Sequence, residues 1–185
     1  MDPGRLHRFP RLPLRRLRDG PHGLEPRRLD MRRFLLALPF ALAACAGSDV
    51  ISPTLPPNYL SDAPRILAAT DWSNPDSVTV TMTNFEFSPS ELNLRRDRAV
   101  RLVFVNPSTK DHTVVSDQFF REVATRQVVG PNGATAAPWL SKLVVPSGET
   151  KEIWLVPARY GAYHFQCDVT GHSALGMNGI INVIP

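Results

Sequence analysis

The sequence predicts an all-β protein, a Greek-key β-sandwich of seven to eight short strands with a short helical insertion. From residue 77 onward, stretches of alternating apolar and polar residues recur at short intervals, and residues typical of turns separate them. This part of the chain shows little helical periodicity. Many short strands with little helix are typical of a domain in which two sheets pack face to face.

The first strands show the alternation most clearly. In "VTVTMTNFEF", Val78, Val80 and Met82 fall on one face of a strand and threonines on the other. The next segment, "SPSEL", is expected to turn the chain. A second clear strand is predicted in "AVRLVFVN", residues 99–106, where the same alternation returns.

The later strands follow the same pattern, with one exception. They are predicted at residues 112–116, at two segments of 140–157 on either side of a Pro-Ser-Gly turn, at 160–167 and at 177–185. The exception is "DQFFREVATRQ", Asp117 to Gln127, which lacks a strict alternation. We expect this segment to form the helical insertion.

The basic charge of the chain is confined to its N-terminus. Residues 1–44 hold ten of the 21 Lys and Arg and four of the 17 Asp and Glu. The remaining residues therefore carry 11 basic and 13 acidic side chains, a net charge of −2. This balance gives no reason to expect nucleic-acid binding.

Residues 31–44 are predicted to be a lipoprotein signal peptide. Two arginines follow Met31, and an apolar run of about 11 residues comes next, too short to span a membrane as a helix. The run ends in "LAAC", which resembles the bacterial lipobox and implies that Cys45 is lipidated. The exported protein would then be anchored to a membrane, facing the periplasm or the cell exterior. An ordinary signal peptide cleaved near Ala44 is the alternative.

The segments on either side of this signal carry little fold information. Residues 1–30 are rich in Arg, Pro and Gly, and they are interpreted as the product of a start codon assigned too early, with an arginine-rich leader as the alternative. Residues 45–76 are rich in Pro, Ser, Asn and Ala. We expect them to form an extended tether, with a short turn near residues 66–69 packed on the domain. The folded domain is predicted to cover residues 77–185.

The candidate metal ligands lie far apart in the sequence. Beyond residue 45 the histidines are 112, 164 and 172, and the free cysteine is 167. In the strand "YHFQC", Cys167 shares a face with Tyr163 and Phe165, whereas His164 points to the opposite side. His164 is therefore expected at the surface. The candidate ligands that remain are His112, Cys167, His172 and Met177.

Two imidazoles, one thiolate and one thioether match the trigonal His₂Cys copper site with a weak axial methionine. Zinc accepts the His₂Cys set, but methionine is a poor zinc ligand. A single cysteine also excludes a two-copper site built on paired thiolates. Gly171 and Gly176 permit tight turns around His172, and Gly179 permits a close approach to a neighbouring strand.

These motifs resemble the cupredoxin family of type 1 (blue) copper proteins. "NPSTKDH" is similar to the loop that delivers the first histidine ligand, and "YHFQCDVTGHSALGMNGIINV" to the ligand loop. The four-residue gaps on both sides of His172 resemble rusticyanin and sulfocyanin more than plastocyanin. Many members have asparagine after the first histidine to brace the loop. Here that residue is Thr113, and we expect Thr113 and Asn106 to act as the bracing residues.

The resemblance implies an electron carrier in the periplasm or at the cell surface that binds one copper ion per chain. All four protein ligands would stay in place, so no coordination position is open for a substrate, which argues against an enzyme. His172 would be the electron exit, within an apolar patch formed by Ala174, Leu175 and Gly176, with Pro107 as a further candidate. The expected partners are a cytochrome or another copper or haem oxidoreductase, and the protein is expected to be a monomer.

Two alternatives stay open from the sequence. The same four ligands would serve copper delivery, storage or resistance without electron transfer. The domain would also resemble one part of a larger copper oxidase or nitrite reductase, although such enzymes need a second copper site with additional histidines.

Overall fold

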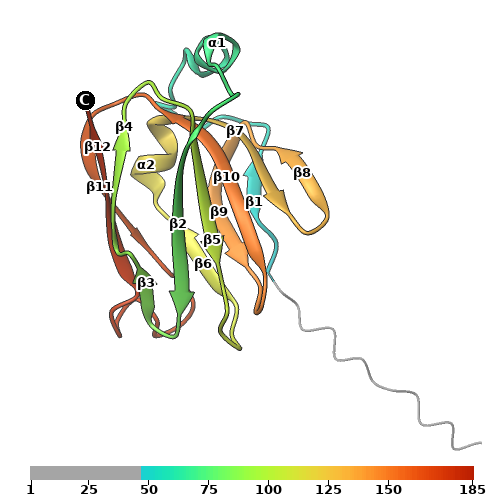
Figure 1. Ribbon diagram of the computed structural model, residues 1–185, viewed down its shortest axis with the longest axis vertical. Helices are drawn as coiled ribbons and strands as arrows, with labels where there is room; N and C mark the ends of the chain where they lie inside the picture. Colours follow the sequence, from blue (N-terminus) through green and yellow to red (C-terminus); the bar gives the residue numbers. More distant parts are fainter. Residues whose placement is uncertain (1–46) are drawn as a thin grey trace, which may run out of the picture. The chain divides into compact units, whose positions relative to one another are not determined.

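The computed structural model describes residues 47–185, which form a sandwich of two six-stranded sheets (Figure 1). The predicted all-β class is confirmed. The predicted signal peptide and the lipidation of Cys45 lie outside the described residues. Within the described part, no helix is long and apolar enough to cross a membrane.

The first sheet supplies the strands that carry the candidate ligands. Its order is β1 (Val50–Ser52), β9 (Trp139–Val145), β6 (His112–Val115), β11 (Gly161–Gln166), β12 (Asn178–Ile184) and β4 (Glu91–Arg95). Neighbouring strands are antiparallel except β12 and β4, which are parallel. β6 and β11 are therefore adjacent, although 45 residues separate them in the chain (115 to 161).

The second sheet covers the other side of the core. Its order is β3 (Glu86–Ser88), β2 (Asp76–Thr83), β5 (Val100–Val105), β10 (Thr150–Pro157), β7 (Val123–Gly130) and β8 (Gly133–Ala136). The alternation predicted for the first strand is present, because Val80 and Met82 are fully buried on β2 while their neighbour Thr81 is half-buried. The inward faces of both sheets form one continuous apolar cluster.

The helical insertion is shorter than predicted. The helix α2 (Asp117–Arg121) lies between β6 and β7, and the chain becomes the strand β7 from Val123 onward. Phe119 and Phe120 of this helix are buried in the main core, which fixes α2 against β9 and β11. The β-branched residues after the helix are better suited to the sheet, where Val123 and Val128 are buried.

The described residues contain twelve strands rather than seven or eight. The difference comes mainly from short strands that weak alternation does not reveal, such as β1, β3 and β8. The segment "SPSEL" turns the chain only briefly, because β4 begins within it at Glu91.

The prediction of an extended tether over residues 45–76 is wrong for the part that the structure describes. β1 pairs with β9 instead. The turn expected near residues 66–69 is part of the helix α1 (Ala63–Ala69), which packs on β7, so its packing on the domain is confirmed. Tyr59 and Leu60 are buried beside Val156, and the Tyr59 hydroxyl donates to the Pro138 carbonyl at 2.9 Å, with the Val123 carbonyl 3.2 Å away. Apolar side chains within a proline-rich segment thus cover one end of the sandwich.

The site lies at the opposite end of the sandwich from α1. There the turn between β2 and β3 lies beside the loop between β11 and β12 (Figure 1). Gly179 permits β12 to approach its neighbours closely, because a Cβ at this position would lie 2.4 Å from the carbonyl oxygen of Ser90, between β3 and β4, and 2.4 Å from the ring of Phe165 on β11. The close approach expected at Gly179 is therefore present.

Candidate metal centre

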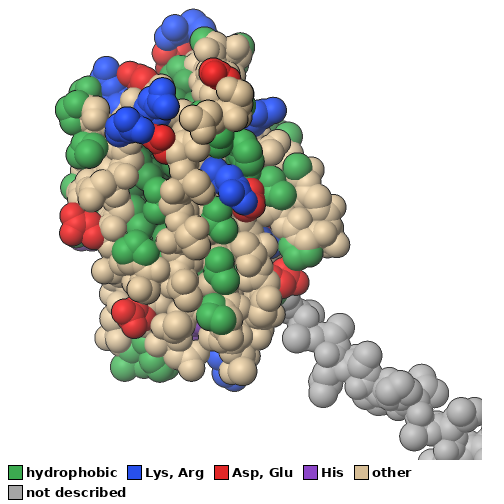
Figure 2. Space-filling view, in the orientation of Figure 1, with side chains coloured by type: hydrophobic (Ala, Val, Ile, Leu, Met, Phe, Trp, Pro, Cys, Tyr) green, Lys and Arg blue, Asp and Glu red, His purple; other side chains and the backbone are tan. Residues whose placement is uncertain are grey.

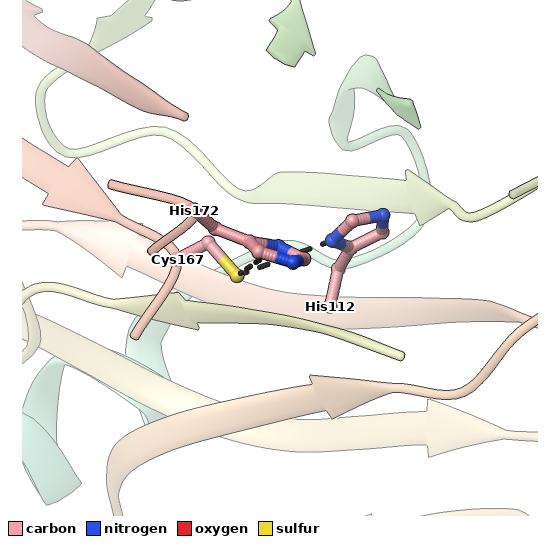
Figure 3. A group of neighbouring side chains, drawn as sticks. All are labelled: His112, Cys167 and His172. Atoms are coloured by element: carbon pink, nitrogen blue, oxygen red, sulfur yellow. Dashed lines mark hydrogen bonds between the residues drawn. The ribbon is translucent and has the colours of Figure 1, made fainter. Parts of the chain in front are cut away.

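Three side chains from separate segments meet at this end of the sandwich. His112 begins β6, Cys167 follows β11, and His172 lies in the loop between β11 and β12. Their ligand atoms all lie within 4.8 Å of one another. The Cys167 Sγ is 3.6 Å from the Nδ1 of His172 and 4.0 Å from the Nδ1 of His112. Figure 3 shows the sulfur and both rings directed toward one another.

The spacing of these donors fits a single metal ion. Metal–nitrogen and metal–sulfur bonds of roughly 2.0 and 2.3 Å, spread at 120° around an ion, place sulfur and nitrogen about 3.7 Å apart. The two observed separations, 3.6 and 4.0 Å, lie close to this value. The donors are therefore in place for coordination without movement of the backbone.

Burial prepares the His112 imidazole to bind a metal. His112 and Cys167 are fully buried, and His172 retains 9% of its accessible surface. Burial lowers the pKa of His112, the nearby His172 lowers it further, and Asp111 opposes the change. A lowered pKa favours the neutral imidazole, which is the form that binds a metal.

The loop between β11 and β12 is closed by its own backbone. The Cys167 N–H donates to the Met177 carbonyl at 3.1 Å, and the Met177 N–H donates to the His172 carbonyl at 3.0 Å. Gly171 and Gly176 have φ values of +85° and +112°, which residues with a Cβ rarely adopt. The tight turns expected around His172 are therefore present.

Met177 is fully buried next to this loop and belongs to the main core cluster. Its backbone hydrogen bonds to Cys167 and His172 hold it beside the other three residues. That the Met177 thioether is the weak axial ligand of the metal stays a prediction.

The cupredoxin-like domain family matches residues 64–177 of the sequence, more than half of the chain. The chain belongs to this family. Together with the geometry, the match supports one copper ion held by His112, Cys167, His172 and Met177. No curated protein matches the sequence.

Solved structures resemble this cupredoxin at low identity. Auracyanin B is 21% identical, with 63% of this chain and 94% of that chain covered and a TM-score of 0.42. Reduced auracyanin from Roseiflexus castenholzii is 19% identical, with coverages of 61% and 100% and a TM-score of 0.43. A multi-copper oxidase from Pseudomonas Thermotolerans is 14% identical, with coverages of 62% and 31% and a TM-score of 0.51, which shows a shared fold alone.

Asn106 braces the loop that delivers His112 to the cupredoxin site. It is fully buried, and its side-chain amide donates to the carbonyls of Lys110 and Val145, both at 2.8 Å. Its Oδ1 accepts the hydroxyl of Ser108 at 2.7 Å. The Ser108 Oγ in turn lies 2.9 Å from the Nε2 of His112.

Sequence reasoning missed this role of Ser108. The Nδ1 of His112 faces the Cys167 sulfur and would hold the metal. Its Nε2–H would then donate to the Ser108 oxygen, whose own proton is bonded to Asn106. This chain of hydrogen bonds selects the tautomer and the ring orientation that metal binding requires.

Thr113 braces the sulfur side of the site. Its N–H lies 3.4 Å from the Cys167 Sγ, and its Oγ1 lies 3.5 Å from the same sulfur. The Oγ1 also contacts the Asp168 carboxylate, which pairs with Lys142. Burial raises the pKa of Asp168, but hydrogen bonds from Lys142 and Thr113 outweigh it and leave the pKa below its usual value.

The surface around His172 is apolar. Leu175 and Phe85 expose 63% and 41% of their surfaces, and Ala174 is also exposed. The ring of Phe85 stands edge-on to His172, with centroids 5.1 Å apart. Phe85 comes from the turn between β2 and β3, where its φ is +66°. Sequence reasoning missed it, because only the fold brings that turn to the ligand loop.

The structure separates His164 from this site. His164 is exposed on β11, and its strand neighbour Phe165 is buried in the core. The expectation that His164 lies at the surface is confirmed. The ligand atoms that come together belong to His112, Cys167 and His172.

We expect Ser108→Ala to weaken copper binding by about 10–100-fold, because the partner that orients His112 is lost. The measurement is a competition titration with a chromophoric copper chelator. Ser141→Ala is the matched control, since the Ser141 hydroxyl bonds the Val50 carbonyl and touches no ligand. Equal affinities of the two variants would contradict the role of Ser108.

Proposed function

We propose that this cupredoxin carries single electrons between redox proteins through a type 1 copper ion. The observation that carries the proposal is the fully buried Cys167 sulfur placed between two imidazoles, with Met177 buried in the same loop. A copper–thiolate bond of this kind supplies a one-electron Cu(I)/Cu(II) couple.

The surroundings of the site favour electron transfer over substrate turnover. The backbone hydrogen bonds between Cys167, His172 and Met177 hold the ligand loop closed. Asn106 and Ser108 hold His112 through the Nε2 side of its ring. A site held this firmly changes little between the two oxidation states, and it keeps no position open for a substrate.

Copper delivery is less consistent with these contacts. Handing copper to another protein requires ligands that a partner can reach, and His112 and Cys167 have no accessible surface. In the described part of the chain the other methionine, Met82, is fully buried in the core on β2 and is not exposed to a partner. The buried donors support a resident ion rather than an exchanging one.

His172 is the electron exit in this proposal. It is the most exposed of the three donors in the cluster, and Phe85, Ala174 and Leu175 surround it with an uncharged apolar surface. Figure 2 shows hydrophobic side chains together with a few charged ones at this end of the molecule, and a larger group of charged side chains at the opposite end. A small apolar face suits brief encounters with a redox partner, such as a cytochrome or another copper or haem protein.

The visible spectrum of residues 46–185 with one equivalent of Cu(II) tests the function. We expect an intense blue or green band from thiolate-to-copper charge transfer. Cys167→Ser should abolish the band, and Met177→Leu, a buried change in the same loop, should retain it and raise the reduction potential. A pale spectrum of the unaltered protein would exclude a type 1 site and favour zinc binding or copper trafficking.

The exit patch is tested without knowing the partner, through the electron self-exchange rate of the protein. We expect Leu175→Asp to slow self-exchange by about tenfold or more, because two like charges meet when the patches dock. Ile184→Asp is the control, since Ile184 is 42% exposed at the far end of β12. Equal rates in both variants, measured by NMR line broadening, would place the exit elsewhere.

We also propose that the protein is exported and held on a membrane by a lipid on Cys45. The support is the apolar run and the "LAAC" sequence. In a bacterial host producing the full-length chain, Cys45→Ser should move the protein from the membrane fraction to the soluble fraction. Membrane association that survives this change would contradict a lipid anchor.

A further inference from the structure

The hydroxyl of Thr113 lies between two acceptors. Its Oγ1 is 2.8 Å from the Asp168 Oδ1 and 3.5 Å from the Cys167 Sγ. The same oxygen accepts the backbone N–H of Asp168 at 2.9 Å. Because a hydroxyl has one proton, it donates fully to only one of the two acceptors.

The carboxylate is the stronger acceptor at the shorter distance. The separation of 2.8 Å is typical of O–H···O bonds, and ionised acceptors form the stronger hydrogen bonds. Sulfur is a weaker acceptor, and here it lies farther away. The hydroxyl proton therefore points to Asp168, and Thr113 gives the sulfur only its backbone N–H.

Lys142 holds the carboxylate in this position. Its ammonium pairs with the Asp168 Oδ2, leaving Oδ1 for Thr113. Lys142 lies on β9, which pairs with β6, the strand that carries Thr113. The side chains of Lys142 and Asp168 are 32% and 34% exposed, so the arrangement extends from the sulfur to the surface.

We propose that Asp168 is a positioning residue that keeps the Thr113 hydroxyl turned away from the Cys167 sulfur. The inference rests on the copper site of the proposed function. A hydrogen bond to the thiolate draws electron density from sulfur and weakens its donation to Cu(II) more than to Cu(I). By withholding one such bond, the Lys142–Asp168 pair lowers the reduction potential of the site.

The test compares Asp168→Ala with Asp168→Asn in the copper-loaded protein. Both changes remove the same negative charge, so both raise the potential by the loss of that charge. Asparagine retains an oxygen that accepts the Thr113 proton, whereas alanine leaves Sγ as the nearest remaining acceptor. We expect a higher potential and a higher-energy thiolate-to-copper band in Asp168→Ala than in Asp168→Asn.

A second comparison tests whether the Thr113 hydroxyl causes the difference in reduction potential between the two Asp168 variants. In a Thr113→Val background the difference between the two Asp168 variants should vanish, and in Thr113→Ser, which retains the hydroxyl, it should return. Equal potentials in the two Asp168 variants, or a difference that persists in Thr113→Val, would overturn the proposal.

A second readout covers the case in which Thr113→Val does not hold copper. Resonance Raman spectra in H₂O and D₂O report exchangeable hydrogen bonds to sulfur through the copper–sulfur stretch. We expect a larger isotope shift in Asp168→Ala than in Asp168→Asn, and equal shifts would overturn the proposal.

Asp49→Ala is the matched control. Asp49 also binds one lysine, Lys151, and one further donor, the Val144 N–H, but it does not contact Thr113. The reduction potential of the Asp49→Ala variant should remain below that of the Asp168→Ala variant. Failure of the unaltered protein to form a blue site would contradict the proposed function itself, whereas a blue site with indistinguishable Asp168 variants would contradict only the role of Asp168.

Discussion

The backbone hydrogen bond from Cys167 to Met177 is the interaction on which the rest of the site depends. It continues the pairing of β11 with β12 by one step beyond Gln166 and Asn178. The ladder therefore fixes both ends of the ligand loop, and the nine residues between them form a closed turn. His172 lies within this turn, so its distance to Cys167 is set by strand register rather than by a flexible connection.

The second constraint is burial of polar groups. His112 and Asn106 have no accessible surface, and each has specific partners within the protein. An unpaired polar group in such a place costs roughly 1–3 kcal/mol, so the loop before β6 has few alternative arrangements. The two halves of the site are thus held independently, one by the ladder and one by the Asn106 and Ser108 hydrogen bonds. A bound metal ion would join two parts whose ligand atoms already lie within 4.8 Å of one another.

The features that could be predicted from the sequence are those that depend on local patterns of residues. Strand parity placed Cys167 inside and His164 outside, and glycine positions indicated the tight turns of the ligand loop. The contributions of Phe85, Ser108 and Asp168 were not predicted, because they depend on contacts between segments that only the folded sheets bring together. The tether was predicted wrongly for a similar reason. Its composition is that of a linker, but Tyr59 and Leu60 are buried by residues far along the chain.

The two ends of the sandwich have different electrostatic character, and this difference bears on how a partner would meet the protein. At the end covered by α1, Arg65, Arg96 and Arg159 each pair with a nearby carboxylate, which cancels much of their field. At the copper end, the exposed surface next to His172 is formed by Phe85 and Leu175, which carry no charge.

Neither end therefore offers a large unpaired charge of one sign to steer a partner over long distances. Recognition would depend on excluding water from a small apolar surface, which gives weak and rapidly reversible contacts. Weak contact would not limit the proposed function, because transfer would require only that the edge of His172 face the partner. The same structure that buries His112 and Cys167 completely thus leaves the His172 ring partly exposed among apolar side chains, as the proposed function requires.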